Sequence, residues 1–243
     1  MLRNLFSGGF STDALIQILY IIPIILITLT FHECAHGYIA YRMGDPTARN
    51  LGRLTLNPLK HLDPIGFLMM MFVGFGWAKP VPINPRYFKN PKKGMAVSAI
   101  AGPASNLIMA IIGAFILGLI NFIGNANEIA YINVSRGAFY MNSSGASSFF
   151  VMGYNFFYMF MTLNVWFAVF NLIPVPPLDG SRVVSYFLPQ RLYYYYNYVE
   201  RYGFLVLFLL LYTGILSVPL TFLSSWIIKG IIYILHFLPF LKF

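Results

Sequence analysis

The chain alternates between long apolar runs and short polar connections. Apolar residues dominate residues 14–43, 95–123, 149–173 and 203–223, and a weaker run covers 226–241. An α-helix rises about 1.5 Å per residue, so about 20 apolar residues are enough to cross the hydrocarbon core of a bilayer. The pattern therefore predicts four or five crossings in an all-α polytopic membrane protein, a bundle of about four to six transmembrane helices.

One apolar stretch is too short to cross. Residues 66–76 read GFLMMMFVGFG and lie between Pro64 and Pro80. A run of this length is shorter than a membrane-spanning helix and is bounded by residues that break regular structure. We therefore expect a short re-entrant or β-hairpin segment here, continuing to about residue 85.

Composition supports the membrane interpretation. Apolar residues make up 58% of the 243 residues, charged residues only 9%, and the mean hydropathy is +0.70, whereas soluble domains carry about 25% charged residues. These values exclude a soluble domain and a disordered chain. The net charge of +9 indicates contact with the lipid bilayer and its anionic headgroups rather than with nucleic acid. The single cysteine, Cys34, excludes a disulfide framework.

The basic residues predict the orientation, because short cytoplasmic connections are enriched in lysine and arginine. The connection between the first two predicted spans carries eight of them, the connection 124–148 carries Arg136 alone, and the connection 174–202 carries three. The first and third connections should therefore face the cytoplasm. The eight residues are Arg49, Arg53, Lys60, Lys79, Arg86, Lys89, Lys92 and Lys93.

Two histidines and a glutamate stand inside the first apolar run. The run contains His32-Glu33-Cys34-Ala35-His36, and residues four apart lie on the same face of a helix. The two imidazoles can therefore bind one metal ion with Glu33 beside it, which is the arrangement of zinc hydrolases. The alternative is a buried polar group whose members bond to one another, but ionisable residues within a span are functional candidates by default.

Catalytic zinc sites usually have a third protein ligand. Asp179 is the best candidate among the acidic residues, because it follows Pro174, Pro176 and Pro177, which end the third apolar run. Irregular backbone at membrane depth is tolerated where it lines a polar cavity or is buried in protein. Asp45 and Asp63 each precede a proline in a connection, and we expect them to cap or stabilise turns.

Taken together, these motifs resemble the site-2 protease family of intramembrane zinc metalloproteases, peptidase family M50. The resemblance rests on HECAH at 32–36 and NLIPVPPLDG at 171–180, and extends to AGPASN at 101–106 and FGWAKPVPINP at 75–85. Leu172 departs from the proline that many members carry at that position. The chain resembles a minimal member without a PDZ or CBS module. We expect one integral membrane metalloprotease domain over 1–243, with a core at about 14–190 and additional C-terminal helices at 203–241.

The resemblance implies a role for each matching residue. His32, His36 and Asp179 would hold one Zn²⁺ per chain, and Glu33 would be the general base. Asn171 would be a catalytic residue that orients the substrate or stabilises the oxyanion. The residues implied in substrate binding are Asn106, Gly76, Lys79 and Pro80. For Asn106 an interhelical hydrogen bond is an equally good interpretation, since small polar residues join helices in membranes.

The implied function is hydrolysis of peptide bonds within or near transmembrane segments of single-span membrane proteins or peptides. The protein would be a multi-pass protein of a prokaryotic cell membrane with its active site toward the cytoplasm. The hairpin would offer a strand edge to an unwound substrate, or would merely pack against the bundle. The alternative functions are a zinc or cation transporter, a catalytically silent zinc-binding scaffold, and a sensor with structural zinc.

Overall fold

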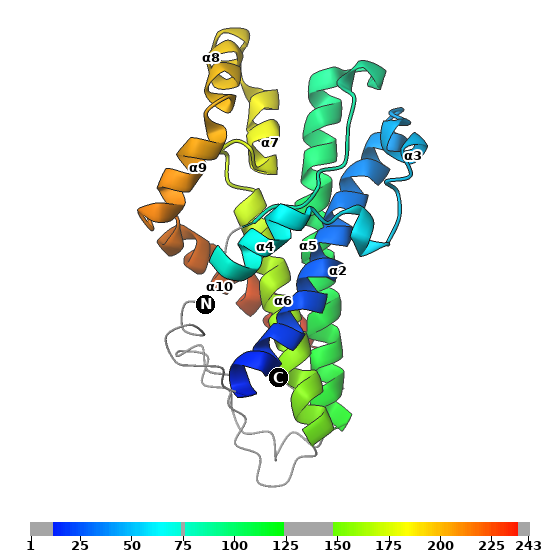
Figure 1. The fold of residues 1–243 in the computed structure, drawn as a ribbon, viewed down its shortest axis with the longest axis vertical. Helices are drawn as coiled ribbons and strands as arrows, with labels where there is room; N and C mark the ends of the chain where they lie inside the picture. Colours follow the sequence, from blue (N-terminus) through cyan, green and yellow to red (C-terminus); the bar gives the residue numbers. More distant parts are fainter. Residues whose placement is uncertain (1–11, 74–75, 124–147, 238–243) are drawn as a thin grey trace.

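The computed structural model describes residues 12–73, 76–123 and 148–237. Three long helices form its centre: α2 (Thr12–Arg42), α5 (Pro91–Ile123) and α6 (Ser148–Asn171). Figure 1 shows them running side by side along the long axis of the molecule. No strand occurs within the described residues, so the all-α prediction is confirmed for them.

Local sequence explains where the long helices begin and end. Gly44 follows α2 with a φ of 109°, a left-handed conformation that glycine adopts without the strain a Cβ would bring. Pro91 is the first residue of α5, where its missing N–H removes no intrahelical bond. The side chain of Asn90 caps the same helix end by accepting a hydrogen bond of 3.0 Å from the Lys93 N–H. The prolines that follow Asn171 end α6.

Short elements connect the long helices. The first connection contains α3 (Thr47–Asn50), η1 (Pro58–Lys60), α4 (Pro64–Val73) and η2 (Pro85–Tyr87). Carboxylates stabilise its turns as predicted: Asp45 accepts from the Thr47 N–H and Asp63 from the Gly66 N–H. The third connection contains α7 (Asp179–Phe187) and α8 (Gln190–Glu200).

The segment that we expected to be re-entrant or a β-hairpin begins with a helix, and its re-entrance stays a prediction. Residues 64–73 form the helix α4, and residues 76–84 are extended without forming a sheet ladder within the described chain. The β-hairpin form of the prediction is therefore wrong for these residues. Asp63 and Pro64 supply an N-terminal cap and a proline at the first helical position, which favour a helix.

The C-terminal helices have different bounds from the predicted apolar runs. The sequence predicted one span at 203–223 and another at 226–241. The structure instead has α9 (Gly203–Tyr212) and α10 (Ser217–His236), and the break between these helices lies inside the first predicted span. Gly214, with a φ of 71°, lies at the break. Helix α9 has only ten residues and is therefore too short to cross a bilayer.

Three described helices are long and apolar enough to cross a membrane: Leu19–Arg42 within α2, α5, and α10. The third predicted crossing corresponds to α6, which has 24 residues. The exact number of crossings therefore stays a prediction.

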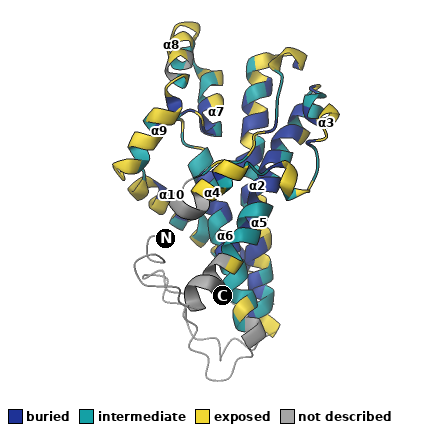
Figure 2. Cartoon of the chain, in the orientation of Figure 1, coloured by how far each residue is buried: buried dark blue, intermediate teal, exposed yellow. Residues whose placement is uncertain are grey.

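The core lies between these helices. Ala110 and Ala114 of α5 pack with Met161 and Val165 of α6, and α10 covers them with its buried side chains. A second cluster joins Ile24 of α2 to α6. Figure 2 shows buried residues along the facing sides of the long helices, whereas α8 and α9 are largely exposed. Contacts of His32 with Asn106 and of His36 with Ser98 hold the C-terminal half of α2 against α5, where the candidate site lies.

Candidate metal centre

The C-terminal half of α2 presents two imidazoles to the bundle interior. His32 and His36 are four residues apart, and their Nε2 atoms lie 3.0 Å from each other. Their exposed fractions are only 5% and 8%. The helical spacing that the sequence suggested therefore brings both rings to one place.

Helix α5 determines which nitrogen of each ring carries the proton. Nδ1 of His36 lies 2.7 Å from the backbone carbonyl oxygen of Ser98, and Nδ1 of His32 lies 2.7 Å from Oδ1 of Asn106. A carbonyl oxygen only accepts hydrogen bonds, so each Nδ1 is the donor. In a neutral imidazole the other nitrogen then has an unprotonated lone pair, and both Nε2 lone pairs face the same point.

The third group comes from the N-terminus of α7. Oδ2 of Asp179 lies 3.1 Å from Nε2 of His32 and 3.3 Å from Nε2 of His36. The proline-rich end of α6 and the close approach of Gly180 to the Leu172 carbonyl bring α7 to this position.

The three groups suit a metal ion. One ligand atom from each of His32, His36 and Asp179 lies within 4.8 Å of the others. Oδ2 of Asp179 is buried and accepts no conventional hydrogen bond within the described chain. Three electron pairs that converge without a donor between them could hold a cation, and two imidazoles with a carboxylate are a ligand set typical of zinc.

Glu33 lies beside this group and is held by the chain that follows α4. The side chain is 8% exposed, and its Oε2 accepts a hydrogen bond of 2.8 Å from the backbone N–H of Val81. One oxygen of the carboxylate is thereby fixed relative to the two imidazoles. The arrangement provides a buried proton acceptor next to a candidate metal position.

The extended residues 76–84 are themselves anchored by three further hydrogen bonds. The Lys79 N–H donates to the His61 carbonyl at 2.9 Å, and Arg53 donates to the Lys79 carbonyl at 2.8 Å. The Asn84 N–H donates to Asp45 at 2.7 Å. Gly76, Lys79 and Pro80, which the resemblance implies in substrate binding, all lie on this segment. Lys79 and Pro80 are exposed there.

The two predicted asparagines have different surroundings. Asn106 is fully buried, and besides His32 its amide contacts Asn164 of α6. This is the interhelical hydrogen bond that was the alternative interpretation. Asn171 lies in the last turn of α6, where its Nδ2 donates to the Phe167 carbonyl at 3.0 Å. The structure thus brings together His32, His36, Asp179 and Asn106, and Asn171 bonds to its own helix.

Sequence reasoning missed three contributors to the site. Gly102 lies directly against both imidazoles, and an added Cβ would be 2.6 Å from Cε1 of His32 and closer still to the His36 ring. The Val81 N–H and the Ser98 carbonyl are backbone groups, for which residue identity gives no signal. Gly102 does carry a signal, since glycine inside an apolar helix often marks a close approach.

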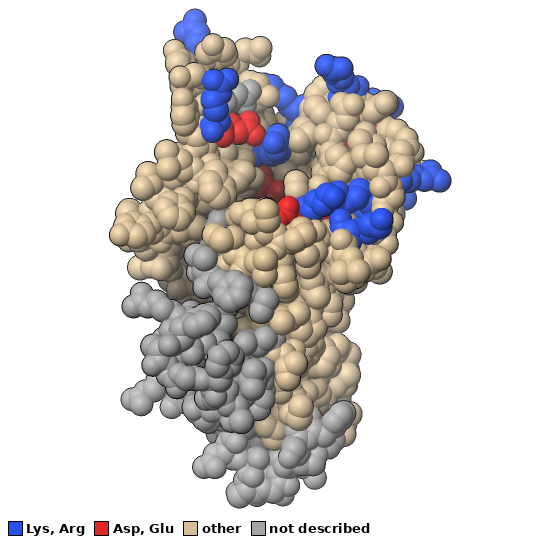
Figure 3. Space-filling model, viewed as in Figure 1, with Lys and Arg blue, Asp and Glu red and all other residues tan. Residues whose placement is uncertain are grey.

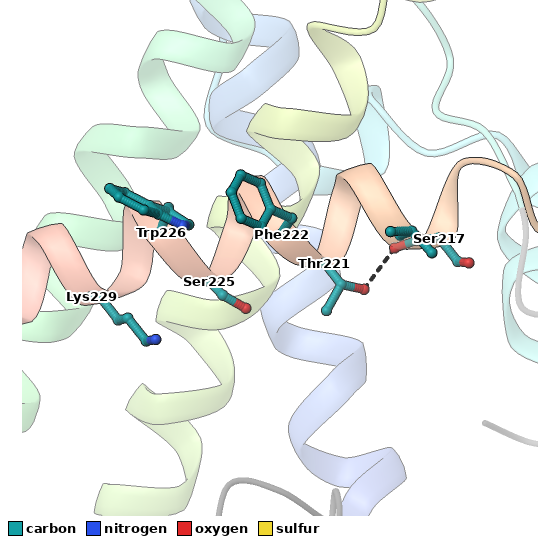
Figure 4. A pocket seen from close by; sticks show the side chains of 7 residues that line it. Ser217, Thr221, Phe222, Ser225, Trp226 and Lys229 are labelled. Carbon is teal, nitrogen blue, oxygen red and sulfur yellow. Dashed lines mark hydrogen bonds between the residues drawn. The ribbon is translucent and has the colours of Figure 1, made fainter.

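A shallow surface groove on α10 is not part of this centre. All the residues that line it belong to α10, as Figure 4 shows. None of them is a predicted site residue. The lining residues are Ser217, Val218, Thr221, Phe222, Ser225, Trp226 and Lys229.

Comparison with known proteins gives a consistent family assignment. Residues 20–213 match the family model of peptidase family M50. The chain is similar to YwhC of Bacillus subtilis, a candidate zinc metalloprotease, with 40% identity over 194 residues, or 80% of each chain. It is 28% identical over 197 residues to Rip2 of Mycolicibacterium smegmatis, also a candidate zinc metalloprotease, covering 79% of this chain and 66% of Rip2.

A more distant similarity extends to an archaeon. The zinc metalloprotease MJ0392 of Methanocaldococcus jannaschii is 25% identical over 177 residues, which are 73% of this chain and 35% of that protein. No solved structure matches the chain.

Proposed function

The chain belongs to peptidase family M50 and is a zinc metalloprotease, and we propose that it hydrolyses peptide bonds within or beside membrane-spanning segments. The observation that carries this proposal is the convergence of His32, His36 and Asp179 on one point next to Glu33. The apolar helices α2, α5 and α10 support a location in the membrane.

We assign one zinc ion to the three converging side chains. Two imidazole nitrogens and one carboxylate oxygen would supply three protein ligands, the number typical of catalytic rather than structural zinc sites. When bound, the ion acts as a Lewis acid that acidifies water and polarises the carbonyl of the scissile bond.

Glu33 is the general base in this proposal. Its Oε2 is held by the Val81 N–H at 2.8 Å, so the carboxylate keeps one orientation while it takes a proton from the attacking water. The same carboxylate then delivers the proton to the leaving amine. Burial strengthens these electrostatic interactions, because water is largely excluded from their surroundings. Asn171 remains a candidate for orienting the substrate, because its bond to the Phe167 carbonyl uses only one of the two N–H groups of the amide.

The extended residues 76–84 are the proposed binding edge for substrate. In an extended chain, the N–H and C=O of one residue point to one side, and those of the next residue point to the opposite side. Lys79 and Val81 direct their N–H groups toward the bundle, so Pro80 and Pro82 direct their carbonyls the other way. Prolines have no N–H, so at Pro80 and Pro82 this edge accepts hydrogen bonds from an unwound substrate and donates none.

The active site is proposed to open toward the cytoplasm. Figure 3 shows the lysine and arginine side chains gathered over one end of the visible face, around the acidic ones. The connections at this end carry most of the basic residues of the chain, which is typical of cytoplasmic connections in a prokaryotic cell membrane.

Replacing the base tests the reaction. Purified protein in liposomes should cleave members of a panel of single-span peptides, and Glu33→Gln should abolish cleavage while zinc stays bound at one ion per chain. The amide keeps an oxygen that can accept from the Val81 N–H but cannot take up a proton. Cleavage by the variant at the wild-type rate would contradict the role of Glu33.

Replacing the third ligand tests the metal site. Asp179→Asn should lower zinc occupancy, measured by metal analysis after dialysis against a weak chelator, because a neutral amide is a much poorer zinc ligand than a carboxylate. Asp63→Asn is the matched control, since Asp63 accepts a turn hydrogen bond from Gly66 that an amide oxygen can also accept. Unchanged occupancy in Asp179→Asn would remove Asp179 from the ligand set.

A further inference from the structure

Two buried asparagines connect His32 to the interior of the bundle. Nδ2 of Asn106 on α5 donates to Oδ1 of Asn164 on α6 at 3.3 Å, and Nδ2 of Asn164 donates to the Phe160 carbonyl at 2.9 Å. Both side chains have an exposed fraction of 0%. The contacts continue at 2.7 Å from Asn106 to Nδ1 of His32, so a row of polar groups runs from a backbone carbonyl to an imidazole.

The Phe160 carbonyl, at one end of this row, sets the direction of every hydrogen bond in it. The Phe160 carbonyl can only accept, so Asn164 must turn its amide nitrogen toward it and its oxygen toward Asn106. Asn106 must then turn its nitrogen toward Asn164 and its oxygen toward His32. If either amide rotated by 180°, two acceptors or two donors would face each other in a buried place, which is unfavourable.

The two histidines differ in how their orientation is secured. His36 donates to the backbone carbonyl of Ser98, which no substitution at position 98 removes. His32 depends on a side-chain amide that has both a donor and an acceptor end. An amide in this position orients the ring correctly only if something else fixes its rotation.

We propose that Asn164, acting through Asn106, fixes the His32 tautomer that leaves the Nε2 lone pair directed at Asp179. Asn106 and Asn164 are positioning residues, and the relay from Phe160 to His32 is a built-in part of the metal centre. This inference rests on the proposed function, because it assigns the relay a role in zinc binding. Partners that orient a metal-binding histidine typically contribute 10- to 100-fold to metal affinity, so the effect is about that size.

The experiment measures zinc affinity by competition with a chromophoric chelator on the full chain in detergent, with Co²⁺ absorption as a report on ligand geometry. Asn106→Leu should weaken zinc binding about 10- to 100-fold, because His32 loses the acceptor for Nδ1. Asn164→Leu should weaken it by a smaller factor, because the Asn106 amide can then rotate. Both should alter the Co²⁺ spectrum.

Variants made in an Asn106→Asp chain distinguish the proposed relay from a loss of side-chain packing. Asn106→Asp keeps an acceptor for His32, and a carboxylate has no donor end whose direction must be set. Zinc affinity should therefore be higher in Asn106→Asp than in Asn106→Leu, and adding Asn164→Leu to Asn106→Asp should cause no further loss. Equal loss from Asn164→Leu in both backgrounds would overturn the relay.

Asn121→Leu is the matched control for lost stability. Asn121 is buried on the same helix, 7% exposed, and lies 15 residues beyond Asn106, or about 22 Å along the axis. It should leave zinc affinity unchanged. An equal loss of affinity in this control, or none in Asn106→Leu, would also refute the proposal.

Failure of the relay and failure of the proposed function give different results. If the wild-type chain binds no zinc and cleaves no peptide, the proposed function fails. If the wild type binds zinc and cleaves while the asparagine variants match it, only the relay is wrong.

Discussion

At the scale of single residues, Gly102 determines how closely α5 approaches the imidazoles. A Cβ at this position would overlap both rings, so Gly102→Ala should displace them from Asp179. Over-packing of this kind costs about 1–3 kcal/mol, which corresponds to roughly a five-fold to hundredfold loss of zinc affinity. Isothermal titration of the purified variant with zinc measures this loss.

The control is a glycine with free space around it. An added Cβ at Gly230 of α10 meets nothing within 4 Å, and Gly230→Ala should leave zinc affinity unchanged. If Gly102→Ala binds zinc as tightly as Gly230→Ala, the contact with the imidazoles does not restrict the site.

Residue-scale features were predictable where one element contains them. His32 and His36 share a helix face, so their proximity follows from helical geometry and spacing. Asp179 could only be ranked by its proline-rich surroundings, because its distance from α2 depends on how α5, α6 and α7 pack. The hydrogen bond of Asn106 to His32 and that of Glu33 to Val81 are long-range contacts that no local pattern encodes.

At the scale of elements, α4 and the extended residues after it form one unit beside the metal centre. Deleting residues 66–76 should abolish cleavage without abolishing zinc content, because all three proposed ligands lie on α2 and α7. The cause would be loss of the support for the proposed substrate edge. Cleavage of a single-span peptide and metal analysis on the same preparation measure the two effects.

A length-preserving variant is the control for this deletion. Replacing residues 66–76 by glycine and serine keeps the distance between α2 and the extended segment while removing the helix. Cleavage that survives the deletion would show that the unit only packs against the bundle. Loss of zinc together with cleavage would show that it supports the ligands.

The division between α9 and α10 shows a limit of hydropathy patterns. The run 203–223 is apolar throughout, and apolarity measures transfer into lipid rather than continuity of the backbone. The helix nevertheless breaks at Gly214, whose φ of 71° is left-handed. Gly214 and the nearby Pro219 were the available signals, since glycine and proline are the residues that most often end or interrupt helices.

At the scale of the whole molecule, the charge distribution predicts a topology that labelling can test. In a Cys34→Ser background, cysteine introduced at Lys60 or at Arg136 should react with a membrane-impermeant thiol reagent on opposite sides of the membrane. Lys60 is exposed in the first connection, and basic connections stay in the cytoplasm.

Labelling in intact cells distinguishes the predicted orientation from its reverse. In intact cells, position 136 should be labelled and position 60 should be protected until the cells are opened. Labelling of position 60 in intact cells would show that the orientation is the reverse of the predicted one.

The all-helical class and the membrane location were predictable from apolar runs, whereas the number of crossings depends on helix breaks and tilts that those runs do not determine.

The separation of the three converging side chains along the sequence has a consequence for synthesis. The histidines on α2 are made early, whereas Asp179 follows α5 and α6. Chains fold progressively from the N-terminus as they emerge from the ribosome. A nascent chain therefore inserts its histidines long before it can complete the proposed metal centre, so newly made protein should have no proteolytic activity until α7 has been translated.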